Sequence, residues 1–176
     1  LLELVKKLKA GEKDLSRVPN LSWRNSEGKV VSNGVTYCAD EAMLNELRFA
    51  NMDLLENYKT YIDYITLPFI VVKRIPIEVN FKMFTARYKL FPLCVGRGCT
   101  HDCTWCGGSY TPQRESISCR EKVIWRGYDA VIADIQQALS YGYEGMYTVF
   151  DPTPNNQSYF VGLFQRIREE GLTKKM

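Results

Sequence analysis

Three of the six cysteines lie close together, in the spacing Cys99-x3-Cys103-x2-Cys106. Cysteine thiolates are the usual protein ligands of iron–sulfur clusters. Three thiolates can hold three irons of a cubane cluster, which leaves the fourth iron open to a small molecule that chelates it. The spacing therefore predicts a cluster that activates a bound molecule, with Cys99, Cys103 and Cys106 as its metal ligands.

The residues around these cysteines favour a loop that follows a bulky group closely. Glycines flank the cysteines on both sides, at Gly96, Gly98, Gly107 and Gly108. Without a side chain, glycine lets the backbone approach a cluster and direct N–H donors at its sulfides. Trp105, directly before the last cysteine, would shield one side of the site from water.

The segment from Cys99 to Cys106 resembles the CxxxCxxC signature of the radical S-adenosylmethionine superfamily, with Trp105 where that family favours an aromatic residue. The resemblance implies a [4Fe–4S] cluster whose open iron is chelated by S-adenosylmethionine, with Gly107 and Gly108 as further contacts to that cofactor. An electron from a flavodoxin- or ferredoxin-like donor would cleave the cofactor, and the resulting 5′-deoxyadenosyl radical would remove a hydrogen atom from substrate. The substrate and any catalytic side chain are left open.

Asp151 is a further candidate contact to S-adenosylmethionine. The resemblance implies that the end of the second strand binds the amino group of the cofactor, and the segment from Phe150 to Pro154 occupies that position. A carboxylate facing an ammonium group is a sound electrostatic match. The usual Gly-Gly-Glu text of the family is absent, so an aspartate that makes a turn before Pro152 is an equally simple interpretation.

Residues 1–35 loosely resemble the connector that follows a cobalamin-binding domain in one large branch of the superfamily. The resemblance is carried by the segment from Val18 to Leu21 and by Gly28-Lys29. It implies cobalamin-dependent methyl transfer in a longer protein, of which we expect this chain to be a piece. The cobalamin domain is not in the sequence, so no bound cobalamin is expected in this chain.

Other interpretations of the cysteines remain open. A structural zinc site could use Cys103 and Cys106 with Cys99, Cys94 or His101, but structural zinc usually takes two separated pairs of ligands. A simple iron–sulfur electron carrier could recruit a fourth thiolate, from Cys94 or Cys119, although small ferredoxins repeat compact cysteine runs. A thioredoxin-like dithiol is disfavoured by the two glycines that follow Cys106.

Single residues near the motif have plainer interpretations. His101 is either a surface bystander or a residue that forms a hydrogen bond near the cluster or tunes the substrate chemistry. Arg97 is a surface arginine or the partner of a carboxylate. Cys94 is expected to be buried in a strand as a small apolar residue. Cys38 and Cys119 carry no motif and are expected to be structural.

The second half of the chain predicts strands over residues 87–95 and 144–150, each followed by a loop and an amphipathic helix. The first helix presents Tyr128, Val131, Ile132, Ile135, Ala138 and Leu139 on one apolar face, with Asp129, Asp134, Gln136 and Gln137 elsewhere. The second points Phe160, Leu163, Phe164 and Ile167 inward. Gly142 and Gly171 are expected to end these helices.

This order predicts an α/β fold with a parallel sheet. The resemblance implies a partial (β/α) TIM-like barrel of the radical S-adenosylmethionine type, incomplete here because a whole barrel takes about 250 residues. Residues 86–176 would supply its first two βα units. Residues 1–85 would form a connector and the tail of a preceding domain, with a helix over 1–10, a hairpin around 25–28 and a helical stretch clearest over 53–58. An open sheet edge favours self-association.

The composition narrows the setting. A net charge of +3, spread along the chain, gives no indication of nucleic-acid binding. The longest apolar run, residues 65–72, is far shorter than the roughly 20 residues of a membrane span. Clustered rather than dispersed cysteines favour a metal or redox site in the reducing cytoplasm.

Overall fold

The computed structural model describes residues 1–64, 89–116, 123–148 and 156–174. The chain forms two compact units, of which the first comprises Leu1–Asp40 and Gly98–Val123, and the second Glu41–Arg97 and Ile124–Met176. The expected boundary between residues 85 and 86 lies outside the described residues, so the division into connector and barrel units stays a prediction.

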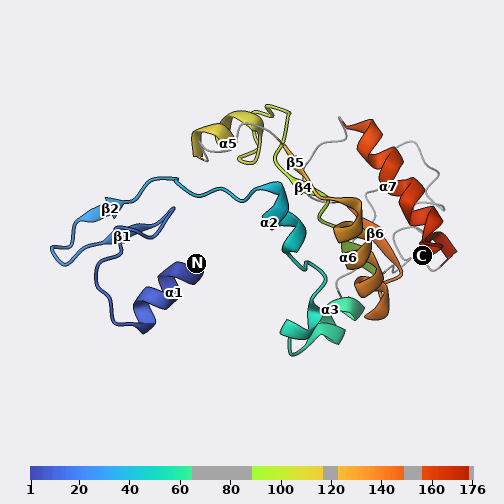
Figure 1. Cartoon of the computed structure of the whole chain (residues 1–176), viewed down its shortest axis with the longest axis horizontal. Helices are drawn as coiled ribbons and strands as arrows, with labels where there is room; N and C mark the ends of the chain where they lie inside the picture. Colours follow the sequence, from blue (N-terminus) through green and yellow to red (C-terminus); the bar gives the residue numbers. More distant parts are fainter. Residues whose placement is uncertain (65–88, 117–122, 149–155, 175–176) are drawn as a thin grey trace. The chain divides into compact units, whose positions relative to one another are not determined.

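The first unit contains a helix, a two-stranded hairpin and a second short helix (Figure 1). These elements are α1 (Leu2–Lys9), β1 (Ser22–Arg24), β2 (Val30–Ser32) and α5 (Tyr110–Ser116). The predicted hairpin is confirmed, because β1 and β2 pair antiparallel with Ser22 opposite Ser32. In its turn the Asn25 side chain accepts backbone hydrogen bonds from Glu27 and Lys29, and Gly28 adopts a positive φ of 76°.

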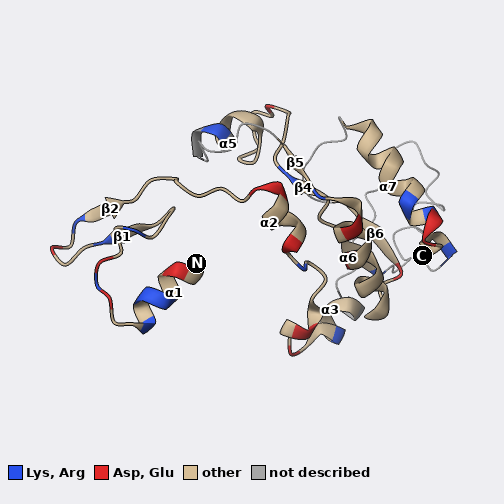
Figure 2. Ribbon diagram, in the orientation of Figure 1, with Lys and Arg blue, Asp and Glu red and all other residues tan. Residues whose placement is uncertain are grey.

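Helix α1 carries charges that suit its dipole. Glu3 lies in its first turn and Lys6, Lys7 and Lys9 lie in its last, as Figure 2 shows by the change of colour along the helix. Opposite charges at the two ends stabilise a helix, since the N-terminus is partially positive and the C-terminus partially negative. Gly11 follows with a φ of 72°, which confirms the predicted helix stop.

Asn33 fastens the hairpin to the loop that precedes it. Its Nδ2 donates to the carbonyls of Leu15 at 2.7 Å and Val18 at 2.8 Å. Its Oδ1 accepts from the Trp23 indole at 3.2 Å. Val18 is 3% exposed, so these hydrogen bonds satisfy backbone groups that water does not reach freely.

The second unit contains a parallel strand pair, an antiparallel strand pair and most of the helices. In chain order its elements are α2 (Glu41–Glu46), η1 (Met52–Leu54), α3 (Tyr58–Tyr64), β3 (Leu90–Pro92), β4 (Gly96–Arg97), β5 (Ile124–Trp125), α6 (Tyr128–Ser140), β6 (Gly145–Tyr147), α7 (Gln157–Glu169) and η2 (Leu172–Lys174).

Strands β3 and β6 pair in parallel, with Leu90 opposite Gly145, and α6 lies between them in the chain. The predicted order of strand, helix and parallel strand is therefore observed here. Strands β4 and β5 pair antiparallel. The described residues form three two-stranded sheets and no closed barrel, so a partial barrel stays a prediction.

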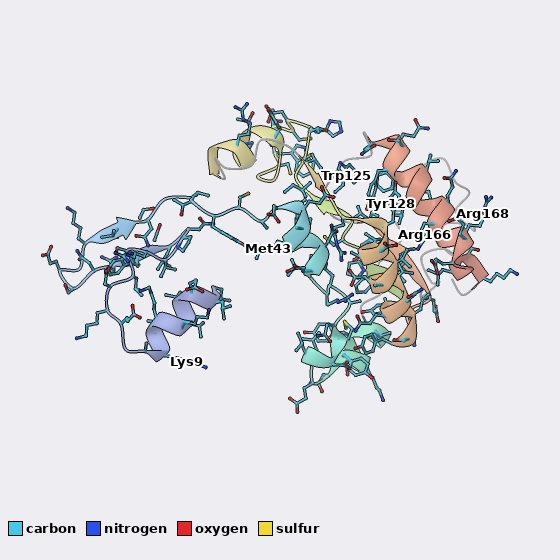
Figure 3. All side chains as sticks on the ribbon, viewed as in Figure 1. Lys9, Met43, Trp125, Tyr128, Arg166 and Arg168 are labelled. Carbon is cyan, nitrogen blue, oxygen red and sulfur yellow. The ribbon has the colours of Figure 1, made fainter. Side chains whose placement is uncertain are left out.

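The core of the second unit lies where α6 and α7 pack with the strands. Its most buried side chains include Phe91, Leu93, Val95, Val131, Ile135, Ala138, Tyr159, Leu163 and Ile167. The rings of Trp125 and Tyr128, both labelled in Figure 3, lie 4.4 Å and 5.2 Å from the Tyr159 ring. Such aromatic contacts add to the stabilisation from buried area. The predicted apolar face of α6 is confirmed for its buried members Val131, Ile132, Ile135 and Ala138.

Two predictions about helix faces are wrong. Phe164 was expected inward but is 63% exposed, and Tyr159 is buried in its place. The buried residues of α7 thus recur every fourth position, from Tyr159 through Leu163 to Ile167, which turns Phe164 toward solvent. Asp134 was expected away from the apolar face of α6 but is fully buried.

The helical stretch predicted over residues 53–58 is also wrong in part. Only Met52–Leu54 forms a single 3₁₀ turn, after which Leu55 is extended (φ −107°, ψ 115°) and α3 begins at Tyr58. Leu54 and Leu55 are 80% and 41% exposed. A helix this short needs a packed apolar face, and these leucines supply none.

Candidate metal-binding loop

The cysteines lie on a loop that begins directly after β4. Gly96 and Arg97 were expected to be part of the loop, but they form β4 and pair with Trp125 and Ile124 of β5. The loop starts at Gly98, whose φ of 106° lies in the region that L side chains rarely adopt. Glycine is therefore required here for the chain to leave the strand direction.

Backbone hydrogen bonds close the loop on itself. The Cys106 N–H donates to the Cys103 carbonyl at 3.1 Å, and the Ser109 N–H donates to the Cys106 carbonyl at 3.1 Å. The Tyr110 N–H donates to the His101 carbonyl at 2.8 Å. Cys103 and Cys106 thus lie at the two ends of one turn, and a second turn follows from Cys106 to Ser109. The hydrogen bond between Tyr110 and His101 joins the two ends of this segment.

The cysteine side chains are accessible to different degrees. Cys103 is exposed, whereas Cys99 and Cys106 are half-buried, and all three carry thiols rather than disulfides. The His101 N–H donates to Cys99 Sγ at 3.4 Å. Contacts of this kind to a ligand atom can orient it for metal binding.

The structure brings two of the three predicted ligands into one turn but does not bring three together. Within the described ranges, no group of three or more His, Cys, Asp or Glu side chains is close enough to hold a metal ion. The donor set itself fits an iron–sulfur cluster, because three accessible thiols on one loop are the ligands that such a cluster uses. Binding would then have to bring the three thiols together.

Asp102 is a functional candidate that the sequence analysis missed. Its carboxylate accepts three hydrogen bonds from the far side of the loop, namely from Thr111 Oγ1 to Oδ2 at 2.8 Å, from the Thr111 N–H to Oδ1 at 3.2 Å, and from Ser109 Oγ to Oδ1 at 3.5 Å. Nothing in the sequence signals that Asp102 meets residues seven and nine positions later, since loop closure depends on the turns between them.

The predicted cofactor contacts are partly described. Gly107 is exposed and lacks a positive φ, and a Cβ built on it meets no described atom within 4 Å. The described part of the fold therefore gives no reason for glycine at this position, and the space beside it is open. Gly108 is half-buried. Asp151 and Cys119 lie outside the described residues.

The remaining residues near the motif divide into buried and exposed ones. Cys94 is 2% exposed with its thiol directed at the Gly96 carbonyl, which confirms that it is buried. It lies between β3 and β4, so the strand predicted over 87–95 is wrong at residues 93–95. Cys38 is half-buried. The His101 side chain is exposed, and it is the backbone of His101 that takes part in the loop. Trp105 is 88% exposed, so its shielding of a bound cluster stays a prediction.

Arg97 makes a contact that neither interpretation of the sequence foresaw. Its guanidinium carbon lies 5.7 Å from the centre of the Phe49 ring, a distance typical of a cation–π contact. Phe49 also lies 4.7 Å from the guanidinium carbon of Arg126. The Phe49 ring therefore contacts two arginines, Arg97 in β4 and Arg126 directly after β5.

Arg126 and Asp134 form a buried ion pair, which the sequence analysis also missed. Arg126 Nη1 lies 2.6 Å from Asp134 Oδ2, and both side chains are 1% exposed. Arg126 also donates to the Cys94 carbonyl at 2.8 Å and to the Leu47 carbonyl at 3.1 Å. One arginine thus joins α6, the segment between β3 and β4, and the segment after α2. Its donors are engaged in structure rather than in chemistry.

No described helix is long and apolar enough to cross a membrane. The assignment of the cysteine loop rests on its own residues and hydrogen bonds, because no family model, no curated protein and no solved structure matches the chain.

Proposed function

We propose that this chain is part of a radical S-adenosylmethionine enzyme in which Cys99, Cys103 and Cys106 ligate a [4Fe–4S] cluster. The observation that carries the proposal is the spacing Cys99-x3-Cys103-x2-Cys106 on a single loop that its own backbone closes. Three ligands leave one iron without a protein ligand, which is the arrangement that an activated small molecule requires.

The chain contributes ligands and their orientation. The His101 N–H, 3.4 Å from Cys99 Sγ, orients this ligand atom. The hydrogen bond from the Cys106 N–H to the Cys103 carbonyl fixes the spacing of the other two ligands. The open space at Gly107 allows a bound group to approach the backbone.

When bound, the cluster supplies the electron for reductive cleavage of S-adenosylmethionine, which yields the radical that abstracts hydrogen from substrate. In this proposal Gly107, Gly108 and Asp151 contact S-adenosylmethionine, and a flavodoxin- or ferredoxin-like protein supplies the electron in the cytoplasm. Cobalamin-dependent methyl transfer belongs to the proposal only for a longer protein. The substrate class is left open.

The arrangement of strands supports the fold part of the proposal. Parallel pairing of β3 and β6 with α6 between them is the unit from which (β/α) barrels are built. The cysteine loop follows the first of these strands by way of β4. Functional loops in such folds lie after the carboxyl ends of strands.

A structural zinc site is the second candidate, and the Cys103–Cys106 turn favours it. A turn with cysteines at both ends, closed by a hydrogen bond from the Cys106 N–H, can present two thiolates to a tetrahedral ion. Cys99 and His101 could supply the two remaining ligands from the same loop. An electron carrier with four thiolates would differ from the first candidate in leaving no iron open.

Anaerobic reconstitution with iron and sulfide, followed by electron paramagnetic resonance of the reduced chain, tests the proposal. We expect a cubane signal that changes on adding S-adenosylmethionine and disappears in Cys99→Ala, Cys103→Ala and Cys106→Ala. Cys38→Ala is the matched control and should keep the signal. A signal that S-adenosylmethionine leaves unchanged would favour the electron carrier, and tightly held zinc with no cluster would favour the structural site.

A further inference from the structure

We infer that Asp102 is a positioning residue for the metal ligands, an inference that rests on the proposed metal binding by the cysteine loop. It acts through Ser109 and Thr111, which lie beyond the last cysteine. Asp102 directly precedes Cys103, and its hydrogen bonds connect this point of the loop to the first turn of α5. These bonds hold the Cys103–Cys106 turn in a closed form.

The geometry of Asp102 supports a mechanical role. Both of its carboxylate oxygens accept hydrogen bonds, with Thr111 Oγ1 at 2.8 Å from Oδ2 and the Thr111 N–H at 3.2 Å from Oδ1. The Thr111 N–H belongs to the first turn of α5, where backbone donors have no helical partner. Asp102 therefore caps this helix from the cysteine loop.

Ser109 adds a buried contact to the same carboxylate. It is 1% exposed, and its hydroxyl lies 3.5 Å from Asp102 Oδ1. A buried hydroxyl without a partner is costly, so the closed form of the loop is favoured over one in which Asp102 moves away. The neighbouring hydrogen bond from the Tyr110 N–H to the His101 carbonyl closes the loop at the same point.

Electrostatics alone would not select an aspartate here. A carboxylate one residue from a thiolate ligand repels it, since both carry negative charge. The benefit of Asp102 must therefore come from the closure it produces. Asparagine has the same shape and can keep both contacts to Thr111, because a threonine hydroxyl can also accept a hydrogen bond.

Two variants distinguish the effect of the hydrogen bonds from the effect of the charge. Asp102→Ala removes every contact to Ser109 and Thr111, whereas Asp102→Asn keeps them and removes only the charge. Outer contacts of this kind typically change metal affinity by 10–100-fold. We expect Asp102→Ala to bind metal about tenfold more weakly than the natural chain, and Asp102→Asn to bind at least as well as it.

The test uses Co²⁺ alone as the probe, titrated anaerobically into the full chain and followed by the absorbance of its thiolate bonds. Thr111→Val should weaken binding in the same direction, and adding it to Asp102→Ala should produce little further loss. Glu27→Ala, which removes an exposed carboxylate from the hairpin turn, is the control and should bind as the natural chain does. Circular dichroism of each variant checks that the fold is retained.

A second measurement needs no metal. Hydrogen exchange of the Tyr110 and Cys106 amides, both bonded within the loop, should become faster in Asp102→Ala while exchange in the β1–β2 hairpin stays unchanged. Equal exchange in the two chains would overturn the inference.

The outcomes for this inference and for the proposed function differ. A natural chain that binds Co²⁺ through its thiolates, together with Asp102→Ala that binds equally well, overturns the role of Asp102 and leaves the metal site standing. A natural chain that binds neither Co²⁺ nor a cluster overturns both.

Discussion

The cysteine loop and the surroundings of Arg126 are organised in opposite ways. In the loop the functional side chains are exposed or half-buried, and short-range hydrogen bonds such as that from Cys106 to Cys103 hold the backbone. Around Arg126 the charged groups are 1% exposed, and their partners come from segments far apart in the sequence.

The contrast indicates which part of the chain is complete without a ligand. The Arg126–Asp134 pair satisfies most of its hydrogen bonds within the protein, and a removed partner would leave a buried charge. The loop carries thiols that are exposed or half-buried, and among the described residues no three potential ligands are close enough to hold a metal ion. The free energy of unfolding should therefore depend on the surroundings of Arg126, and metal binding should depend on the cysteine loop.

The largest expected effect is the loss of the buried ion pair. Asp134→Ala leaves the Arg126 guanidinium buried and without its counter-charge, which typically destabilises a protein by about 3–5 kcal/mol. The free energy of unfolding in urea measures this loss. Asp129→Ala on the same helix removes an exposed partner of Arg166 and is the matched control. An equal loss of unfolding free energy in Asp134→Ala and Asp129→Ala would show that the buried ion pair is no more important for stability than an exposed one.

Gly162 tests how tightly the packing of the second unit is specified. A Cβ at this position would lie 2.8 Å from Tyr128 Cζ and closer still to the Tyr128 hydroxyl oxygen. Overpacking costs about 1–3 kcal/mol, which exceeds the roughly 1 kcal/mol that alanine gains over glycine inside a helix. We expect Gly162→Ala to lower the free energy of unfolding by about 1 kcal/mol.

The same substitution has an internal control. Tyr128→Phe removes the closest atom, so Gly162→Ala in that background should cost less than in the natural chain. A cost that is equal in both backgrounds would show that the Tyr128 ring moves aside freely.

Tyr159→Phe is expected to have an effect of similar size, which depends on pH. Its hydroxyl donates to the Arg126 carbonyl at 2.8 Å, so Tyr159→Phe should cost about 1 kcal/mol. Burial raises the pKa of the Tyr159 phenol well above the ordinary value of about 10. The folded chain then keeps a proton that the unfolded chain loses.

The sign of the pH dependence follows from this difference in bound protons. Stability should decrease as the pH rises above about 10, because only the unfolded state ionises there. Urea unfolding between neutral pH and pH 11 should show a weaker decrease in Tyr159→Phe. An unchanged slope would assign the alkaline sensitivity to other groups, such as Tyr143, whose pKa is also raised by burial.

The smallest expected effect on stability is that of Trp105. Its side chain is 88% exposed, so Trp105→Ala should leave the urea midpoint unchanged. If Trp105 covers a bound cluster, the variant should nevertheless lose its reconstituted cluster to oxygen faster than the natural chain. A lower urea midpoint in Trp105→Ala would show that the cysteine loop also contributes to stability, contrary to the contrast with the surroundings of Arg126.

The local elements were predictable because each depends on neighbouring residues. The hairpin could be predicted because a turn segment separates two short strand-forming segments. The ends of α1, α6 and α7 could be predicted from Gly11, Gly142 and Gly171, each of which has a positive φ. The parallel pairing of β3 and β6 follows from the order of strand, helix and strand.

Predictions failed where tertiary packing, rather than the local sequence pattern, decides the outcome. Asp134 has the polarity of a surface residue, and only Arg126 explains its burial. Phe164 is as apolar as Leu163, and the packing of α7 selects between them. In the loop, the cysteine spacing could be recognised, but the role of Asp102 depends on a backbone path that places Thr111 beside it.

The contacts of Asn33 also bear on how the protein ages. In an asparagine–glycine pair such as Asn33-Gly34, the glycine nitrogen readily attacks the side-chain amide and releases ammonia, since glycine offers no steric hindrance. Here Nδ2 is engaged with the Leu15 and Val18 carbonyls, and the amide must leave both before it can react. Once deamidated, the residue would direct a carboxylate at those same carbonyls. The folded hairpin thus slows its own chemical decay, and each deamidated molecule would be marked by a loosened hairpin and one added negative charge.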